Sequence, residues 1–139
     1  MPRRLILLSL ALLLSLALLL RPAAATPRIG CTRPVNASEA AEAARQLGAF
    51  CADNGPISAT AKVSWRVGGT RAYACNYAGK SANPCSFGEL IAAQKAIDAR
   101  CRGGEAAAEG IIGGGWWYEP AWKKTYGFDG AAASWCGNL

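Results

Sequence analysis

The chain has 139 residues, of which 52% are hydrophobic, and a formal net charge of +6. Residues 1–25 hold 11 of the 14 leucines, and residues 26–139 keep only 15 large aliphatic or phenylalanine side chains. That number is too small for core burial alone to fold a domain. The complete absence of histidine excludes Ser-His-Asp catalysis and histidine-ligated metal sites.

The first 25 residues have the pattern of a secretory signal peptide. Arg3 and Arg4 precede an apolar stretch over residues 5–20, and three alanines at 23–25 form a small-residue cleavage site. The alternative is an uncleaved membrane anchor, but the apolar stretch is shorter than the roughly 20 residues that span a bilayer. We therefore expect cleavage after Ala25. The product would be one secreted domain over residues 26–139, with a charge of +3 and no stable membrane insertion.

Asn36 has two predicted roles. It begins an Asn-Ala-Ser sequon and is therefore a candidate for N-glycosylation. It also stands three residues before Glu39, which predicts that Asn36 caps a helix over residues 37–50 while Glu39 closes a capping box. The sequence Asn54-Gly55-Pro56 would stop that helix.

Residues 62–77 predict a β-hairpin. Apolar and polar side chains alternate strictly over 62–67, Gly68-Gly69 suits a two-residue turn, and residues 70–77 return as the second strand. This register places large side chains beside alanines on the buried face.

The other face of the hairpin brings Arg66 opposite Arg71 and Ser64 opposite Tyr73. Two like charges opposite each other cost stability. Either the arginines diverge at an exposed tip, or Arg66, Arg71 and Tyr73 form a small basic and aromatic binding face.

A second helix is expected from its cap at Ser86 to Cys101, with Glu89 in its first turn. A glycine-rich segment over 105–115 follows. Residues 116–122 then predict a strand bent at Pro120, and residues 123–127 a turn. The elements predict an α+β sandwich in the order α-β-β-α-β, with or without a short final strand, in which both helices cover one face of an antiparallel sheet.

Six cysteines in a short secreted chain predict a disulfide framework. They are Cys31, Cys51, Cys75, Cys85, Cys101 and Cys136. A helix between Cys85 and Cys101 would hold these two about 22–24 Å apart, which excludes a bond between them. Up-and-down connections favour Cys31–Cys101 and leave the remaining four to share two bonds. With every cysteine oxidised, no metal site or cofactor is expected.

The segment after residue 115 holds most of the aromatic side chains. Trp116, Trp117 and Trp122, with Lys123 and Lys124 beside them, would form a glycan or protein contact if exposed. The alternative is that these tryptophans fill a core that lacks aliphatic residues, leaving one or two partly exposed.

Several short motifs carry a resemblance to a known class of proteins. These are Tyr-Ala-Cys-Asn-Tyr at 73–77, Pro-Cys-Ser at 84–86, Lys-Lys-Thr-Tyr-Gly-Phe-Asp at 123–129 and Trp-Cys at 135–136. With them the chain resembles the small secreted cysteine-rich proteins of filamentous fungi, many of them candidate effectors. The expected sandwich also resembles the folds of killer toxins and necrosis-inducing effectors. The resemblance implies a fungal origin but no catalytic residues.

One kind of catalysis needs neither a histidine nor a cysteine thiolate. A glycosidase needs only two carboxylates, for which Glu119, beside the tryptophans, and Asp129 are the candidates. The opposing interpretation is that Glu119 is a solvated strand residue.

The sequence therefore favours a secreted, non-enzymatic, monomeric interaction protein, effector-like or toxin-like, that binds an extracellular protein or glycan and no nucleic acid. The alternative is a carbohydrate-binding or cell-wall-active protein that uses the tryptophan cluster. An antimicrobial protein is a third option, which the modest charge of +3 makes weaker.

Overall fold

A five-stranded antiparallel sheet forms the centre of the protein in this computed structural model, which describes residues 25–102 and 109–137. Residues 1–24 of the predicted signal peptide lie outside the described residues. The strand order across the sheet is β1-β6-β7-β4-β3. The strands are β1 (Arg28–Cys31), β3 (Lys62–Val67), β4 (Thr70–Asn76), β6 (Gly115–Glu119) and β7 (Lys124–Gly130).

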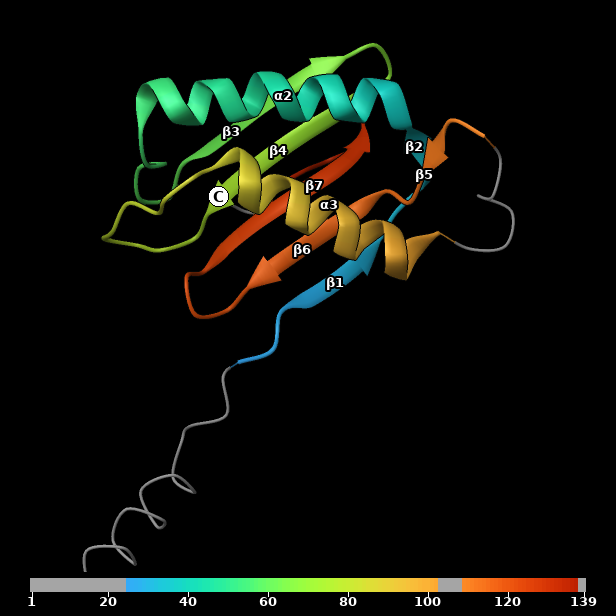
Figure 1. The fold of residues 1–139 in the computed structure, drawn as a ribbon. Helices are drawn as coiled ribbons and strands as arrows, with labels where there is room; N and C mark the ends of the chain where they lie inside the picture. Colours follow the sequence, from blue (N-terminus) through green and yellow to red (C-terminus); the bar gives the residue numbers. More distant parts are fainter. Residues whose placement is uncertain (1–24, 103–108, 138–139) are drawn as a thin grey trace, which may run out of the picture.

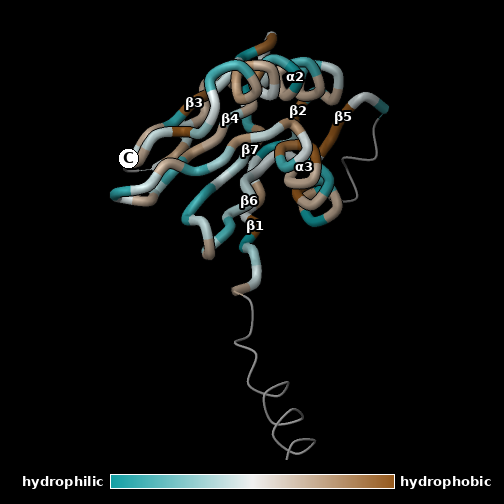
Figure 2. The backbone as a smooth tube through the Cα atoms, turned by 60° about the vertical axis from the view of Figure 1, so that its left-hand side comes forward, coloured by the Kyte–Doolittle hydropathy of each residue, from teal (hydrophilic) through white to brown (hydrophobic). Residues whose placement is uncertain are grey.

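Two helices, α2 (Ala37–Asn54) and α3 (Phe87–Cys101), cover the same face of this sheet (Figures 1 and 2). Helix α2 packs on β3 and β4, and α3 packs on β1, β6 and β7. A second sheet of two short strands, β2 (Val35–Asn36) and β5 (Ile111–Ile112), lies beside them. The predicted α+β class and the placement of both helices on one face are confirmed.

The hairpin of β3 and β4 has the predicted register. Trp65 pairs with Ala72, and Val67 pairs with Thr70. Ala72 is fully buried beneath α2, so the large residues of β3 do pack beside small ones. Strand β4 ends at Asn76, one residue earlier than expected.

Helix α2 begins as predicted and ends four residues later than predicted. The Asn36 side chain accepts a hydrogen bond from the Glu39 backbone N–H at 3.0 Å. The Glu39 carboxylate does not close the capping box. It accepts hydrogen bonds from the Gly69 N–H at 3.0 Å and the Thr70 hydroxyl at 2.9 Å instead. The helix continues to Asn54, where Gly55 ends it at φ 74°, a conformation that glycine adopts without strain.

The predicted turn over residues 123–127 is wrong. The turn occupies residues 120–123, and β7 runs from Lys124 to Gly130 between β6 and β4. The predicted strand over 116–122 is accordingly shorter and ends at Glu119. The alternation typical of a strand is hard to recognise in β7 for two reasons. The buried face of β7 carries a lysine, and the other face carries Gly127 where an aromatic or β-branched residue is usual.

Strands β1, β2 and β5 were not predicted. Strand β1 pairs with β6, more than 80 residues later in the chain, and Arg28 lies opposite Tyr118. Such a pairing has no local signal, because the proline-flanked segment before Asn36 resembles a loop.

Small residues bring the helices close to the sheet and to each other. Ala40, Ala43 and Ala44 on α2 are fully buried. A Cβ atom on Gly48 would lie 2.8 Å from the Cβ of Phe87, so glycine is needed where the two helices meet. The close approach compensates in part for the scarcity of large aliphatic side chains.

Three disulfides link the described elements, with Cα–Cα distances of 5.3, 5.3 and 5.8 Å. Cys31–Cys101 joins β1 to the end of α3, as predicted. Cys51–Cys85 joins the end of α2 to the residue before the cap of α3, and Cys75–Cys136 joins β4 to the C-terminal segment. Cys85 and Cys101 are not bonded to each other, and this prediction is also confirmed.

Candidate functional site: an aromatic groove on the open face of the sheet

The face of the sheet that the helices leave uncovered carries a groove of about 600 Å³. Because side chains alternate along each strand, every second residue points to this open face. We call the hollow the aromatic groove. Its lining comes from β1, β4, β6, β7 and the C-terminal segment and consists of Arg28, Thr32, Tyr73, Tyr77, Trp116, Tyr118, Thr125, Asp129, Ser134, Trp135, Cys136 and Gly137.

Trp116 forms an exposed aromatic surface of this groove. Its indole lies against Gly30 on the neighbouring strand, where a Cβ atom would overlap the ring. The side chain is 37% exposed, so one face of the ring rests on the sheet while the other is open. Flat, exposed indoles of this kind stack on planar or ring-shaped apolar surfaces.

Asp129 and Tyr73 form the buried floor of the groove. The Tyr73 hydroxyl donates to Asp129 Oδ2 at 2.8 Å, and the Thr32 hydroxyl donates to Oδ1. Burial raises the pKa of Asp129, while these two hydrogen bonds and the charge of Arg71 act in the opposite direction. Burial, and then the nearby Asp129 carboxylate, raise the pKa of Tyr73. The floor is therefore a closed polar network.

The C-terminal segment forms one wall of the groove. Cys136 is bonded to Cys75 on β4, and the ring of Trp135 lies 5.6 Å from that of Tyr73. Two cations, Lys62 and Arg71, each lie 5.1 Å from the centre of the Trp135 ring. A disulfide and cation–π contacts thus hold this wall in place.

The three predicted binding tryptophans do not form one surface. Trp116 faces the groove, whereas Trp117 faces α3 and stacks 6.4 Å from Tyr126. Trp122 is 54% exposed and lies in the turn between β6 and β7. Trp117 is thus a partly buried packing residue, and Trp122 belongs to a different part of the surface.

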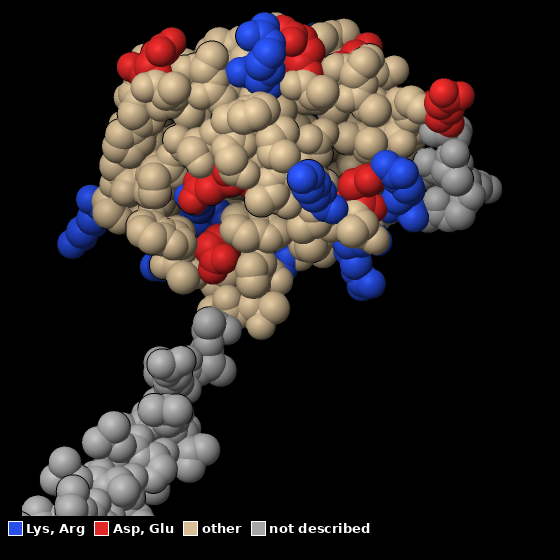
Figure 3. Space-filling model, in the orientation of Figure 1, with Lys and Arg blue, Asp and Glu red and all other residues tan. Residues whose placement is uncertain are grey.

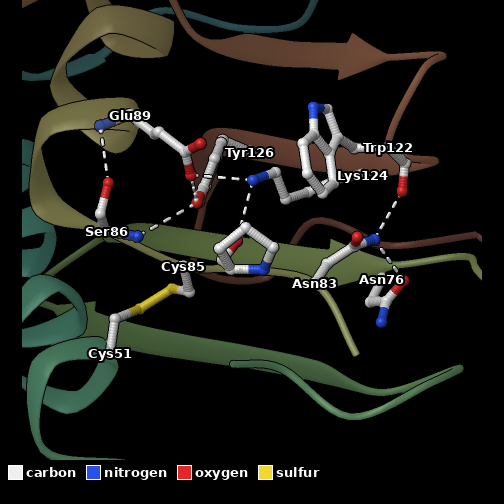
Figure 4. A network of polar contacts seen from close by, with 10 residues as sticks. Cys51, Asn76, Asn83, Cys85, Ser86, Glu89, Trp122, Lys124 and Tyr126 are labelled. Carbon is white, nitrogen blue, oxygen red and sulfur yellow. Dashed lines mark hydrogen bonds and ion pairs between the residues drawn. A yellow bond between two sulfur atoms is a disulfide. The ribbon is translucent and has the colours of Figure 1, made fainter. Parts of the chain in front are cut away.

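Lys124 is not the surface residue that was predicted; it is 1% exposed. Its Nζ donates to Glu89 Oε2 and to the Pro84 carbonyl, both at 2.8 Å, and the Tyr126 hydroxyl donates to the same carboxylate oxygen at 2.7 Å (Figure 4). The network ties β7 to the start of α3. Lys123 is exposed in the adjacent turn.

The two arginines of the hairpin have different partners, and only Arg66 is exposed. Arg71 covers Trp135, and its guanidinium donates to the Ala133 carbonyl at 3.3 Å. Arg66 is exposed and donates through Nε to the Gly68 carbonyl at 3.0 Å. Tyr73 is 2% exposed, so these three residues do not form a shared surface.

The two candidate carboxylates of a glycosidase lie on opposite faces of the sheet. Glu119 pairs with Lys124 and shares its face, toward α3, whereas Asp129 faces the groove. A glycosidic bond cannot lie between side chains separated by the sheet. Among the described residues, no cluster of three or more histidine, cysteine, aspartate or glutamate side chains could hold a metal ion.

The helix-covered face of the sheet lies opposite the groove. In Figure 3, which looks onto that face, acidic and basic side chains are interspersed. Eight groove residues were not predicted as site residues: Arg28, Thr32, Tyr77, Tyr118, Thr125, Ser134, Trp135 and Gly137. The alternation of residues 124–129 was the available signal, because it marks a strand whose odd positions share the groove with β4 and β6.

The fold and the groove define a small α+β protein stabilised by three disulfides, with a hollow aromatic surface on the sheet face opposite the helices. Comparisons of the chain with protein-family models, with curated proteins and with solved structures each return no match. None of the helices in residues 25–102 and 109–137 is long and apolar enough to cross a membrane.

Proposed function

We propose that this is a secreted, non-enzymatic binding protein, effector-like or toxin-like in its role, that holds an extracellular ligand in the aromatic groove. The observation that carries the proposal is the groove itself, in which five aromatic side chains and several hydroxyl groups meet in a hollow of ligand size. Three disulfides suit a protein that works in an oxidising extracellular medium.

The state of the acidic residue in the groove supports a proposal of binding without catalysis. Asp129 is 2% exposed, and both of its carboxylate oxygens accept hydrogen bonds from protein hydroxyls. A general acid or base must reach the reacting atoms of the substrate. Asp129 is instead placed to orient Thr32 and Tyr73.

A specific observation favours a carbohydrate as the ligand. Trp116 offers an open ring face, and three hydroxyl-bearing residues, Thr32, Thr125 and Ser134, line the same hollow. A pyranose has an apolar ring face and hydroxyls at its edge, and it fits such a surface better than a flat, wholly apolar ligand does. This gives the earlier carbohydrate hypothesis a different tryptophan surface from the one that the sequence predicted.

The proposal is tested by measuring ligand binding. The protein is produced by secretion from a eukaryotic host, so that its disulfides are formed. Screening on a glycan array would be followed by titration of the wild type, Trp116→Ala and Trp122→Ala. Trp122 is a matched control, since it is the more exposed tryptophan and lies outside the groove. We expect Trp116→Ala to weaken binding about tenfold or more and Trp122→Ala to leave it unchanged. Equal loss in both variants, or saccharide hydrolysis by the wild type, would contradict the proposal.

A further inference from the structure

A second hollow adjoins the aromatic groove. It has a volume of about 610 Å³ and shares two lining residues, Thr32 and Asp129, with the groove, so the two hollows lie side by side, and we call the pair the trough. We call this second hollow the arginine pocket. Its other lining residues are Arg33, Arg66, Gly69, Gly130, Ala131, Ala132 and Ala133.

The trough is longer than a single sugar ring. Arg28 lies beside Tyr118 at its aromatic end, and Thr32 marks the junction four residues further along the chain. At about 3.3 Å per residue this is roughly 13 Å, before the arginine pocket is counted. A ligand that fills both hollows is therefore a chain of several units.

The charge along the trough is positive where it meets solvent. Arg28 lies at one end, and Arg33 and Arg66 lie at the other; all three are exposed. The acidic side chain among the lining residues is Asp129, which is buried beneath its two hydroxyl partners. Arginine pairs with carboxylates through two parallel hydrogen bonds, and this geometry suits a ligand with carboxylates at intervals.

We propose that the ligand is an acidic oligosaccharide, a chain of uronate-type pyranoses that stacks one ring on Trp116 and pairs its carboxylates with Arg33 and Arg66. The inference rests on the proposed carbohydrate-binding function. Beyond that function, the inference specifies the charge of the ligand, its length and the direction in which it crosses the sheet.

The test uses a matched pair of probes, short galacturonate oligomers and their methyl esters, which have the same rings with and without charge. The secreted protein is titrated with each by calorimetry. We expect the acid to bind about tenfold or more tightly than the ester. Raising the salt concentration should weaken binding of the acid and leave binding of the ester unchanged.

Variants of the arginine pocket test whether Arg33 and Arg66 cause the preference for the acid. Arg66→Ala combined with Arg33→Ala should remove the preference for the acid, so that acid and ester bind with equal affinity. Arg45→Ala is the matched control, because Arg45 is an exposed arginine on α2, on the far side of the sheet. Circular dichroism confirms that each variant is folded.

The outcomes separate this inference from the function on which it rests. Equal affinity for acid and ester, with loss of both in Trp116→Ala, overturns the acidic ligand and supports carbohydrate binding. Failure of every saccharide to bind overturns both. Tighter binding of sulfated oligosaccharides, abolished in the double arginine variant, overturns the assignment of carboxylates.

Discussion

The hydroxyl of Tyr73 on β4 donates a hydrogen bond to Oδ2 of Asp129 on β7 at 2.8 Å, although the residue directly opposite Tyr73 is Gly127. A Cβ on Gly127 would overlap the Tyr73 ring, so the glycine lets the tyrosine lie across the strand and reach the carboxylate two residues further on. This contact fixes the floor of the groove.

The buried carboxylate predicts a pH dependence of stability. Burial raises the pKa of Asp129 above its ordinary value of 3.8, so the folded protein keeps a proton that the unfolded chain releases. The bound proton stabilises the folded protein when the pH is below the ordinary pKa of the carboxyl group. This stabilisation is lost as the pH rises through the pKa of the folded protein. We expect the free energy of unfolding of the wild type, relative to Asp129→Asn, to fall as the pH rises. Urea denaturation at a series of pH values measures it, and a difference that grows with pH would contradict the assignment.

Replacement of Glu39 tests the link between α2 and the hairpin. Glu39→Ala removes the acceptor for the Gly69 N–H and the Thr70 hydroxyl, and Thr70 is 2% exposed. We expect a loss of about 1–2 kcal/mol in the free energy of unfolding, since the buried hydroxyl loses its partner. Glu42→Ala, which breaks an exposed pair with Arg45, is the control and should be neutral. Equal effects in urea denaturation would show that Glu39 acts only through helix propensity.

The Lys124–Glu89 pair should respond unequally to removal of its two partners. Glu89→Ala leaves a lysine that is 1% exposed with the Pro84 carbonyl as its remaining hydrogen-bond acceptor. We expect a cost of about 1–3 kcal/mol, below that of a fully buried pair because the Glu89 side chain is 44% exposed. Lys124→Met should cost less, since water can solvate the remaining carboxylate. Thermal and urea unfolding measure both, and a larger cost for Lys124→Met would contradict this account.

Gly30 should control the position of Trp116. In Gly30→Ala the new methyl group overlaps the indole, so the ring must leave the sheet. We expect a destabilisation of about 1 kcal/mol and greater quenching of tryptophan fluorescence by iodide. Gly88→Ala, where the added methyl meets nothing within 4 Å, is the control and should leave the quenching unchanged. Unaltered quenching in Gly30→Ala would show that the indole does not rest on this glycine.

Reduction of the disulfides should unfold the protein. Each bond typically contributes about 2–4 kcal/mol, and three together approach the whole stability of a small domain. The core offers little to replace them, because fully buried alanines make up much of it. Circular dichroism during thermal unfolding, with and without a reductant, measures the effect. Cooperative unfolding near the oxidised midpoint after full reduction would show that the packing suffices.

Local patterns determined the two helices, the hairpin and one of the three disulfides. Asn36 and Ser86 cap their helices as predicted, since a cap depends on residues three positions apart. The alternation in 62–67 specified the register of β3, because a shift by one residue would expose its apolar face. The length of α3 excluded a Cys85–Cys101 bond, and the up-and-down connections favoured Cys31–Cys101.

The groove depended on contacts between distant segments. The sequence suggested three neighbouring tryptophans as one surface, but pleating sends Trp116 and Trp117 to opposite faces, and the turn at residues 120–123 takes Trp122 elsewhere. Lys124 looked exposed because its partner Glu89 lies 35 residues earlier in the chain.

By itself the sequence determined an α+β protein held by three disulfides, with a predicted export signal, because these features rest on composition, periodicity and spacing. Only the tertiary structure decided which aromatic side chains stay open to a ligand. That choice follows from the pairing of β1 with β6 and the bond between Cys75 and Cys136, which bring residues near both ends of the chain to one face of the sheet. No local pattern records such pairings, because their free energy is gained only when the whole sheet forms.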